Sequence, residues 1–222
     1  MRPDPSLPAT TQPESRSSSP AGLSAGRPRL YILAGGRSSR FGADKARAEV
    51  DGQPLIRRIA EALQNVTEQP CVVAAEPGRY ADLGLTTCAD PRPHLGPLAG
   101  VATALRHAAA SDLGHDRWLL ITACDWINPE PACLNSLRTA VRKSPGIQAA
   151  AFFDERWQPL PMLIHADALP GVQRQIDHGR MSLWRMLEAI GAARVAVPAN
   201  HGPLLHANTP AEFAAAIGGT RS

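Results

Sequence analysis

Apolar and polar residues alternate in two kinds of block along the 222-residue chain. Short unbroken apolar runs are typical of buried strands, whereas apolar residues that recur every three or four positions are typical of helices. The runs that predict strands lie at 29–34, 71–75, 85–88, 118–123, 148–153, 160–165 and 193–198.

Helical spacing fills most of the intervals between these runs. The interval 54–64 carries its apolar side chains on one face and has Pro54 in its first turn, where proline is favoured. Further helices are predicted over 96–110, 129–143, 166–178 and 182–190. A last helix should begin near Pro210, with Thr209 as its N-cap.

Strands that alternate with helices predict βαβ units and an α/β fold, in which a Rossmann-like, mostly parallel sheet is flanked by helices on both faces. We expect one domain over residues 29–217. Residues 1–28 are rich in Pro, Ser, Thr and Gly and bury too little apolar surface to fold, so we expect a disordered leader there. Residues 218–222 are expected to form a flexible C-terminal tail.

Charge and composition exclude several classes of protein. Lys and Arg number 23 against 20 Asp and Glu, and the net charge of +3 is too small for a nucleic-acid-binding surface. No apolar run approaches the roughly 18 residues that span a membrane, and the N-terminus lacks the apolar region of a signal peptide. We therefore expect a cytoplasmic protein without nucleic-acid or membrane partners. The four cysteines lack C-x-x-C spacing, which favours a reducing compartment and leaves a disulfide open.

Candidate chemistry begins in the stretch LAGGRSSRFGADK, residues 33–45, which overlaps the end of the first predicted strand. Its adjacent glycines, Gly35 and Gly36, allow the backbone to approach a ligand closely. Its cations are Arg37, Arg40 and Lys45. The patterns G-x-x-x-x-G-K-[ST] and G-x-G-x-x-G are absent. The strand context and the cations favour a polyphosphate-binding loop over the alternative, a glycine-rich surface turn with solvated arginines.

The same stretch closely resembles the nucleotidyltransferase signature L-A-G-G-x-S-x-R-x-G-x-x-K. The chain is similar to the molybdenum cofactor guanylyltransferases of the MobA type over roughly residues 29–217. Further matches, each weak alone, follow in the family's order: DGQPL at 51–55, Asp90, GPLAG at 96–100, Cys124-Asp125, QPL at 158–160 and NTP at 208–210.

This resemblance implies a fold of the nucleotidyltransferase type and a reaction that transfers GMP from GTP to the molybdenum-molybdopterin cofactor. Pyrophosphate is released, the substrates are GTP and molybdenum-molybdopterin, and Mg²⁺ is the expected cofactor. The resemblance also implies transient contacts with molybdopterin-handling proteins or with recipient molybdoenzymes.

The resemblance further assigns roles around the nucleotide. Four residues are expected to cradle the base and phosphates with their backbone: Leu33, Ala34, Gly35 and Gly36. Arg40 is expected to neutralise the departing pyrophosphate, and Lys45 to steady the α-phosphate. Charge develops on the phosphoryl oxygens and on the leaving group, so cations at these places would supply much of the acceleration.

Acidic residues follow two of the predicted strands. Asp125 comes after the apolar run WLLITAC and is the expected Mg²⁺ ligand, with a solvated carboxylate or a helix N-cap as the alternative. Asp90 is expected at the nucleotide, with turn formation before Pro91 as the alternative. Gly96 is expected either to contact the nucleotide or only to start a helix.

Three residues are candidates for the second substrate. Arg180 and Ser182 lie in GRMS at 179–182, which either holds the phosphate of the pterin at a helix start or forms an ordinary cap. Asn208 either donates to the second substrate or joins the turn before the last helix.

Four positions depart from the family pattern: Phe41, Ala74, Trp126 and His206. Ala74 and His206 stand where asparagine is frequent, and Trp126 is expected to crowd the metal site. These departures leave open a non-catalytic relative that binds molybdopterin or nucleotide. A cytidylyltransferase acting on the same cofactor is the other alternative, although the Gly35-Gly36 pair favours guanine. A sugar-nucleotide pyrophosphorylase is disfavoured because the chain is short.

Overall fold

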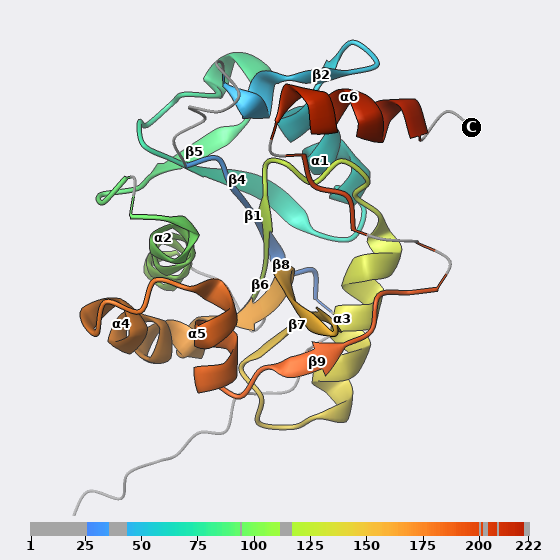
Figure 1. Cartoon of the computed structure of the whole chain (residues 1–222). Helices are drawn as coiled ribbons and strands as arrows, with labels where there is room; N and C mark the ends of the chain where they lie inside the picture. Colours follow the sequence, from blue (N-terminus) through green and yellow to red (C-terminus); the bar gives the residue numbers. More distant parts are fainter. Residues whose placement is uncertain are drawn as a thin grey trace, which may run out of the picture.

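A computed structural model describes residues 26–35, 44–93, 95–111, 117–199, 201, 204–207 and 209–219. A seven-stranded sheet lies in the middle of the molecule, and helices pack on both of its faces (Figure 1). This arrangement confirms the α/β fold with flanking helices that the alternating pattern predicts.

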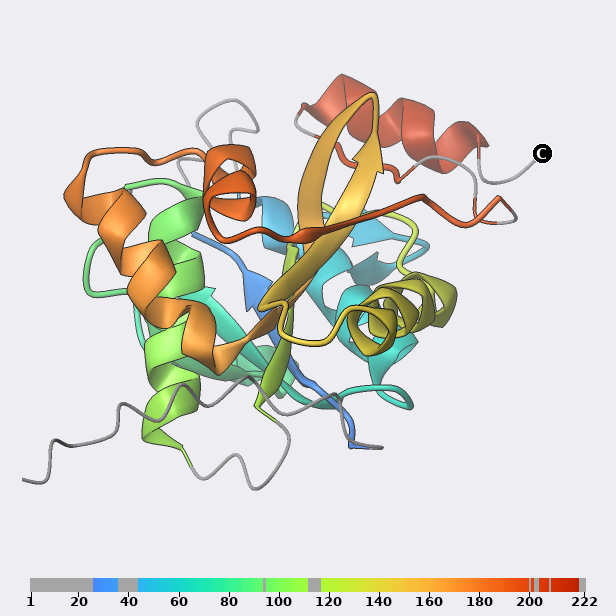
Figure 2. The same cartoon turned by 90° about the horizontal axis from the view of Figure 1, so that it is seen from below.

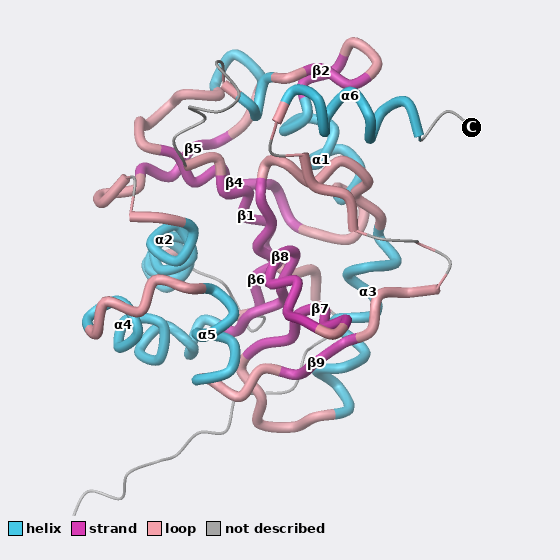
Figure 3. Tube along the Cα trace, viewed as in Figure 1, coloured by secondary structure: helices cyan, strands magenta, loops and turns pink. Residues whose placement is uncertain are grey.

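The strands of the central sheet follow the spatial order β5-β4-β1-β6-β8-β7-β9 (Figure 3). Their bounds are β1 Arg29–Leu33, β4 Glu68–Ala74, β5 Thr86–Ala89, β6 Trp118–Ala123, β7 Ala149–Asp154, β8 Arg156–His165 and β9 Ala193–Val195. Strand β8 runs antiparallel to both of its neighbours, whereas the other pairs of this sheet are parallel. The sheet is therefore mostly parallel, as predicted.

Helices cover the two faces in separate groups (Figure 1, Figure 2). One face carries α2 (Pro97–Ala110), α4 (Leu169–Asp177) and α5 (Leu183–Ala189). The other carries α1 (Leu55–Leu63) and α3 (Pro131–Lys143), with α6 (Pro210–Gly219) beyond α1. Short 3-10 turns lie at η2 (Lys45–Arg47), η3 (Ala81–Leu83) and η4 (Ala166–Ala168).

Side chains alternate between the two faces along each inner strand, and this alternation explains the two helix layers. In β1, Leu30 and Ile32 pack in the cluster that includes α1 and α3. Tyr31 and Leu33 pack in the cluster that includes α2, α4 and α5. A strand buried on both faces reads as a continuous apolar run, which is the pattern from which β1 and β6 are predicted.

The ends of several strands differ from the prediction. Strand β4 starts at Glu68 rather than at residue 71, and β8 starts at Arg156 rather than at residue 160. The added β8 residues are polar, but they pair with β7 in a hairpin in which Asp154 lies opposite Arg156. A small sheet of β2 (Glu49–Val50) and β3 (Gln53–Pro54) was not predicted, because two-residue strands are too short to leave an apolar pattern.

The helices fit the prediction more closely. Pro54 lies at the N-cap of α1, just ahead of the first turn in which it is expected. The helix predicted over 166–178 is divided into the turn η4 and the helix α4. The hydroxyl of Thr209 accepts a hydrogen bond from the Glu212 amide at 3.1 Å, which confirms the N-cap predicted for α6.

The described part of the predicted leader contacts the domain. The Gly26 carbonyl accepts a hydrogen bond from Arg138 Nη2 at 2.8 Å. The Pro28 carbonyl accepts one from the Glu68 amide at 3.0 Å. At the other end, α6 reaches Gly219, inside the tail predicted over 218–222. The division into leader, domain and tail stays a prediction.

Neither a membrane span nor a disulfide is found in the described part of the chain. None of its helices combines the length and the apolar character that crossing a membrane requires. Each of the four cysteines is a free thiol.

Candidate functional site

The candidate site lies where β1, β4, β5 and β6 end. Beyond the strands, backbone hydrogen bonds continue the pairing: the Cys124 amide donates to the Leu33 carbonyl at 3.0 Å, and the Asp90 amide donates to the Ala74 carbonyl at 2.7 Å. Parallel strands place their carboxyl ends at one edge of the sheet, where α/β proteins bind ligands. The glycine-containing loop, Asp90 and Asp125 therefore share this edge.

Lys45 and Asp125 meet across the site. Lys45 Nζ lies 2.9 Å from Asp125 Oδ2, although the two residues are 80 positions apart in the chain. Lys45 is only 9% exposed, and a lysine is rarely buried so far without an anionic partner. The structure thus joins two of the residues for which the sequence predicts catalytic roles.

Asp44 fixes the turn that carries Lys45. Its carboxylate accepts a hydrogen bond from the Ala46 amide at 3.2 Å and caps the turn η2. The same carboxylate accepts bonds from the Tyr80 hydroxyl at 3.1 Å and from Arg79 Nη2 at 3.1 Å. Burial and the Asp44 charge raise the pKa of Tyr80 above its ordinary value. Sequence reasoning gave Asp44 no role, since its partners lie far away in the chain.

His206 contacts the other oxygen of the Asp125 carboxylate. His206 Nδ1 lies 2.9 Å from Asp125 Oδ1. Burial raises the pKa of the Asp125 carboxyl, but the contacts with His206 and Lys45 outweigh burial and hold this pKa below its ordinary value. The sequence singles out His206 only as a departure from the family, so its place beside Asp125 is a finding of the structure.

A small pocket of about 20 Å³ lies beside this group and is lined by Leu33, Gly35, Val73, Asp90, Gly96, Pro97 and Gly100. Four of these residues are predicted nucleotide contacts: Leu33, Gly35, Asp90 and Gly96. Gly96 has a φ of +88°, which favours glycine. A Cβ on Gly100 would stand 3.2 Å from the Leu33 side chain, so α2 approaches β1 closely here. Four of the eight predicted nucleotide residues therefore line one cavity.

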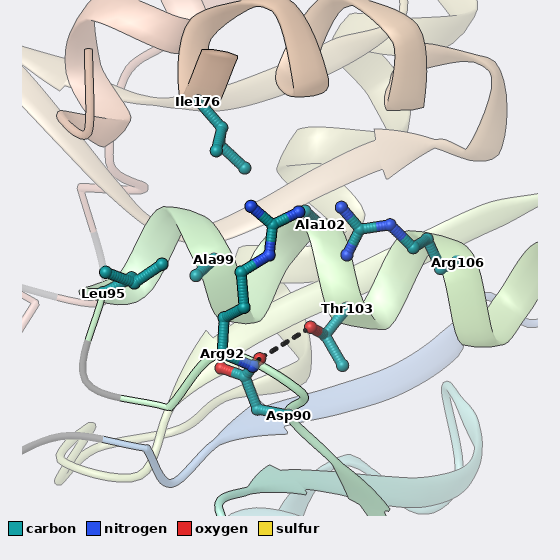
Figure 4. A pocket seen from close by; sticks show the side chains of 8 residues that line it. All are labelled: Asp90, Arg92, Leu95, Ala99, Ala102, Thr103, Arg106 and Ile176. Carbon is teal, nitrogen blue, oxygen red and sulfur yellow. Dashed lines mark hydrogen bonds between the residues drawn. The ribbon is translucent and has the colours of Figure 1, made fainter. Parts of the chain in front are cut away.

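Asp90 is held by its own neighbours. The Thr103 hydroxyl donates to Asp90 Oδ1 at 3.0 Å (Figure 4), and the Arg92 amide donates to the same oxygen at 3.0 Å. Among the described residues, no hydrogen bond to Asp90 Oδ2 is found. Asp90 also borders a second small cavity, between α2 and α4, into which Arg92 and Arg106 project. One carboxylate oxygen is thus fixed, and the other can meet a ligand.

Two of the departures from the family pattern lie in the core. Trp126 is 1% exposed and packs in the cluster that contains α1 and α3, where Leu204 is a neighbour. Ala74 is fully buried in the same cluster. Cys124 also serves packing, and burial raises the pKa of its thiol to about 12. A nucleophilic role for this thiol is therefore disfavoured.

Several predicted site residues are not seen in contact with Lys45, Asp125 or His206. Arg180 is exposed and Ser182 is half-buried, and both lie between α4 and α5. Gly36, Arg40 and Asn208 lie outside the described residues, as does Phe41. Ala34 continues β1, with its amide donating to the Val73 carbonyl at 2.9 Å.

The Asp125 carboxylate is the candidate metal ligand at this edge of the sheet. The described residues contain no cluster of three or more His, Cys, Asp and Glu side chains. Asp125 keeps 19% of its side chain exposed. Because Mg²⁺ commonly binds one or two carboxylates together with substrate phosphates, the Asp125 carboxylate fits this ion.

Known proteins share both the sequence pattern and the fold. The family model of the MobA-like NTP transferase domain matches residues 30–206. A Deinococcus radiodurans protein named "Probable molybdenum cofactor guanylyltransferase" is 38% identical over 154 residues, covering 68% of this chain and 75% of its own length. The molybdenum cofactor guanylyltransferase of Serratia proteamaculans is 30% identical over 181 residues, covering 80% and 88% of the two chains.

A solved structure supports the same fold. The crystal structure of molybdopterin-guanine dinucleotide biosynthesis protein A from Archaeoglobus fulgidus superimposes with a TM-score of 0.71 at 21% identity, covering 87% of this chain and 98% of that one. The family match spans the strands and the acidic and basic residues of the site. The chain therefore belongs to the family of MobA-like NTP transferases.

Proposed function

We propose that this chain transfers GMP from GTP to the molybdenum-molybdopterin cofactor and releases pyrophosphate. Relatives named molybdenum cofactor guanylyltransferase, which it matches over most of its length, support this proposal. The observation that carries it is the contact of Lys45 Nζ with Asp125 Oδ2 at 2.9 Å, at the sheet edge where a nucleotide would bind. This contact supports the proposal because it joins a cation to a carboxylate that could bind a metal ion.

The reaction joins two phosphates. A phosphate oxygen of the acceptor forms a bond to the α-phosphorus of GTP, while the bond between that phosphorus and the bridging oxygen to the β-phosphate breaks. The bond pair leaves with pyrophosphate. Positioning and charge stabilisation supply most of the acceleration in such transfers. Lys45 would steady the α-phosphate, and Arg40 would neutralise the leaving group.

Asp125 would hold Mg²⁺, with the nucleotide phosphates completing its coordination. The bound ion supplies positive charge against the phosphoryl oxygens as their negative charge increases. In this structure the two oxygens of Asp125 are engaged by Lys45 and His206. A phosphate next to Lys45 would offer its ammonium group another anion, which would weaken its hold on Asp125 and leave the carboxylate available to the ion.

The guanine nucleotide would lie at the sheet edge beside β1, against the residues that line the small pocket there. The backbone of Leu33, Ala34, Gly35 and Gly36 would approach the base and phosphates. Asp90 and Gly96, which line the same pocket, would bind on the opposite side. Asp90 Oδ2, which accepts no hydrogen bond from the described residues, can accept hydrogen bonds from N–H groups of the base, while Thr103 holds the other oxygen.

The pterin substrate would bind on the side of α5. We propose that three residues contact it: Arg180, Ser182 and Asn208. Arg180 is exposed to solvent just before α5 begins. An exposed arginine suits a phosphate because it binds two oxygens at once. Molybdopterin-handling proteins or recipient molybdoenzymes would meet the chain here to exchange the cofactor.

A nucleotide panel tests the proposal. The full chain is incubated with molybdenum-molybdopterin, Mg²⁺ and one of GTP, CTP or ATP, and pyrophosphate release is followed. We expect release with GTP and with neither of the others. Activity with CTP alone would make the chain a cytidylyltransferase, and nucleotide binding without pyrophosphate release would make it a non-catalytic relative. Omission of the acceptor controls for simple hydrolysis.

A further inference from the structure

The position of His206 is set by its backbone. After β9 the chain returns to the end of β6, where residues 204–207 run antiparallel to residues 125–128. His206 forms a β-bridge with Trp126, and the Ile127 amide donates to the Leu205 carbonyl at 2.9 Å. Asn128 Oδ1 accepts a hydrogen bond from the Leu205 amide at 2.9 Å. This short ladder brings the imidazole to the Asp125 carboxylate.

The two oxygens of this carboxylate have unlike neighbours. Oδ2 faces the ammonium group of Lys45. That group is itself a cation and has no lone pair, so it cannot serve as a metal ligand. Oδ1 faces Nδ1 of His206 at 2.9 Å, and a ring nitrogen is a metal ligand in its neutral form. The His206 side chain is 25% exposed, so a solvated ion can reach it.

The spacing of these two atoms suits one ion. Two ligands at right angles on an octahedral ion, each about 2.1 Å from it, stand about 3.0 Å apart. The observed separation of Nδ1 and Oδ1 is 2.9 Å. Rotation about the side-chain bonds can turn both lone pairs toward a shared ion without moving the backbone ladder.

The nitrogen atom changes which ions fit. Mg²⁺ binds oxygen ligands, whereas imidazole suits borderline transition ions. We propose that His206 is a second protein ligand of the cation at this site and shifts its preference from Mg²⁺ toward a divalent transition ion that accepts imidazole. This inference rests on the proposed function, because the ion is the one that accompanies the nucleotide.

The test compares two ions in the absence of the pterin acceptor. The full chain with GTP is titrated with Co²⁺ or Mg²⁺ by calorimetry, and the visible absorption of bound Co²⁺ reports its ligands. Any site favours Co²⁺ to some extent, so the readout is the ratio of the two affinities in each variant. We expect His206→Asn to lower this ratio by about tenfold or more, and to change the Co²⁺ absorption band.

Matched variants make the result specific. His178→Asn removes an exposed histidine at the end of α4 and should leave both the ratio and the band unchanged. Asp125→Asn should weaken both ions. Thermal unfolding checks the fold of each variant, and His206→Gln replaces His206→Asn if the latter does not fold.

Two failures can be told apart. An unchanged affinity ratio and an unchanged Co²⁺ band in His206→Asn would overturn the ligand role of His206 and leave the proposed function standing. Absence of GTP binding to the unmodified chain with either ion would overturn the proposed function, and this inference with it.

Discussion

Lys45 is one of only two lysines in the chain, and the structure buries it against Asp125. Removing its charge takes away stabilisation that grows as the α-phosphate becomes more negative. We therefore expect Lys45→Ala to lower kcat by roughly 10²–10³-fold, with a similar loss for Asp125→Ala. Pyrophosphate release under saturating GTP measures this effect.

The second lysine provides the control. Lys143 is exposed at the end of α3, so Lys143→Ala should keep the kcat of the unmodified chain. Full turnover in both Lys45→Ala and Asp125→Ala would contradict the roles proposed for these residues.

Thr103 positions Asp90, for which we propose a nucleotide contact. Its hydroxyl donates to Asp90 Oδ1 at 3.0 Å, and both residues are buried. A hydrogen bond to a charged group contributes about 1.5–3 kcal/mol, so Thr103→Val should raise the KM for GTP by roughly tenfold or more. Because Asp90 is proposed to contact the base and not the reacting phosphate, kcat should change little. Steady-state kinetics with GTP separates the two constants.

The conservative variant distinguishes positioning from packing. Thr103→Ser keeps the hydroxyl and should restore most of the affinity for GTP. A KM as high in Thr103→Ser as in Thr103→Val would show that the methyl group, and not the hydrogen bond, matters.

At the scale of elements, the packing of α4 against α5 depends on Gly171. Alanine is ordinarily about 1 kcal/mol more favourable than glycine in a helix. A Cβ on Gly171, however, would stand 2.9 Å from Ile190 Cγ2, closer than two carbons can approach. We expect Gly171→Ala to lower the free energy of unfolding by about 1–3 kcal/mol. Urea denaturation measures this change.

The partner side chain gives a direct check. In the Ile190→Ala background the contacting methyl group is absent, so Gly171→Ala should become neutral or stabilising. The same loss of stability in both backgrounds would place the strain elsewhere.

The elements were predictable where burial leaves a pattern. Strands β1 and β6 are buried on both faces and read as continuous apolar runs, so their predicted bounds are within one residue of those observed. The start of β8 was missed because Arg156 and its polar neighbours join the sheet only through pairing with β7. The pairing of two strands cannot be predicted from the apolar and polar pattern of either strand alone.

The candidate site also contains residues that the sequence predicts and a contact that it does not predict. Lys45, Asp90 and Asp125 follow strand ends or a glycine loop, and family resemblance adds their roles, so they could be proposed from the sequence. The contact of His206 with Asp125 joins residues 81 positions apart. It depends on the backbone pairing between residues 204–207 and 125–128, which the apolar and polar pattern of neither segment predicts.

At the scale of the whole molecule, Gly26 and Pro28 of the predicted leader are hydrogen-bonded to the domain. A chain that starts at Gly26 should unfold at the temperature of the full chain. A chain that starts at Arg29 loses two hydrogen bonds, each contributing about 0.5–1.5 kcal/mol. Each lost kcal/mol lowers the unfolding temperature by about 2–4 °C for a domain of this size.

Calorimetry of the two shortened chains measures this difference. Equal unfolding temperatures for both would show that residues 26–28 contribute nothing to stability. A lower value for the chain that starts at Gly26 would assign a stabilising role to residues 1–25, contrary to the predicted leader.

Both tyrosines of the chain are fully buried, which predicts the response of the molecule to alkali. Burial raises the pKa of Tyr31 to about 12, and Tyr80 is shifted in the same direction. A raised pKa in the folded state stabilises the protein fully below the ordinary value near 10, and this contribution is lost as the pH rises through 12. Unfolding should therefore accompany tyrosine ionisation.

Absorbance of tyrosinate and circular dichroism, recorded together from pH 9 to 13, should show coincident transitions above pH 10. Tyr31→Phe should make stability less sensitive to pH in this range. Ionisation of both tyrosines near pH 10 in a chain that stays folded would contradict the prediction.

The pairing of residues 204–207 with 125–128 also bears on how the protein is made. A ribosome releases the chain from its N-terminus, so β1, α2 and β6 emerge well before His206. Lys45 and Asp125 can meet early in synthesis, but the contact of His206 with Asp125 forms only after residue 206 has left the ribosome. Nascent chains and products of premature termination that end before residue 206 therefore lack the contact of His206 with Asp125.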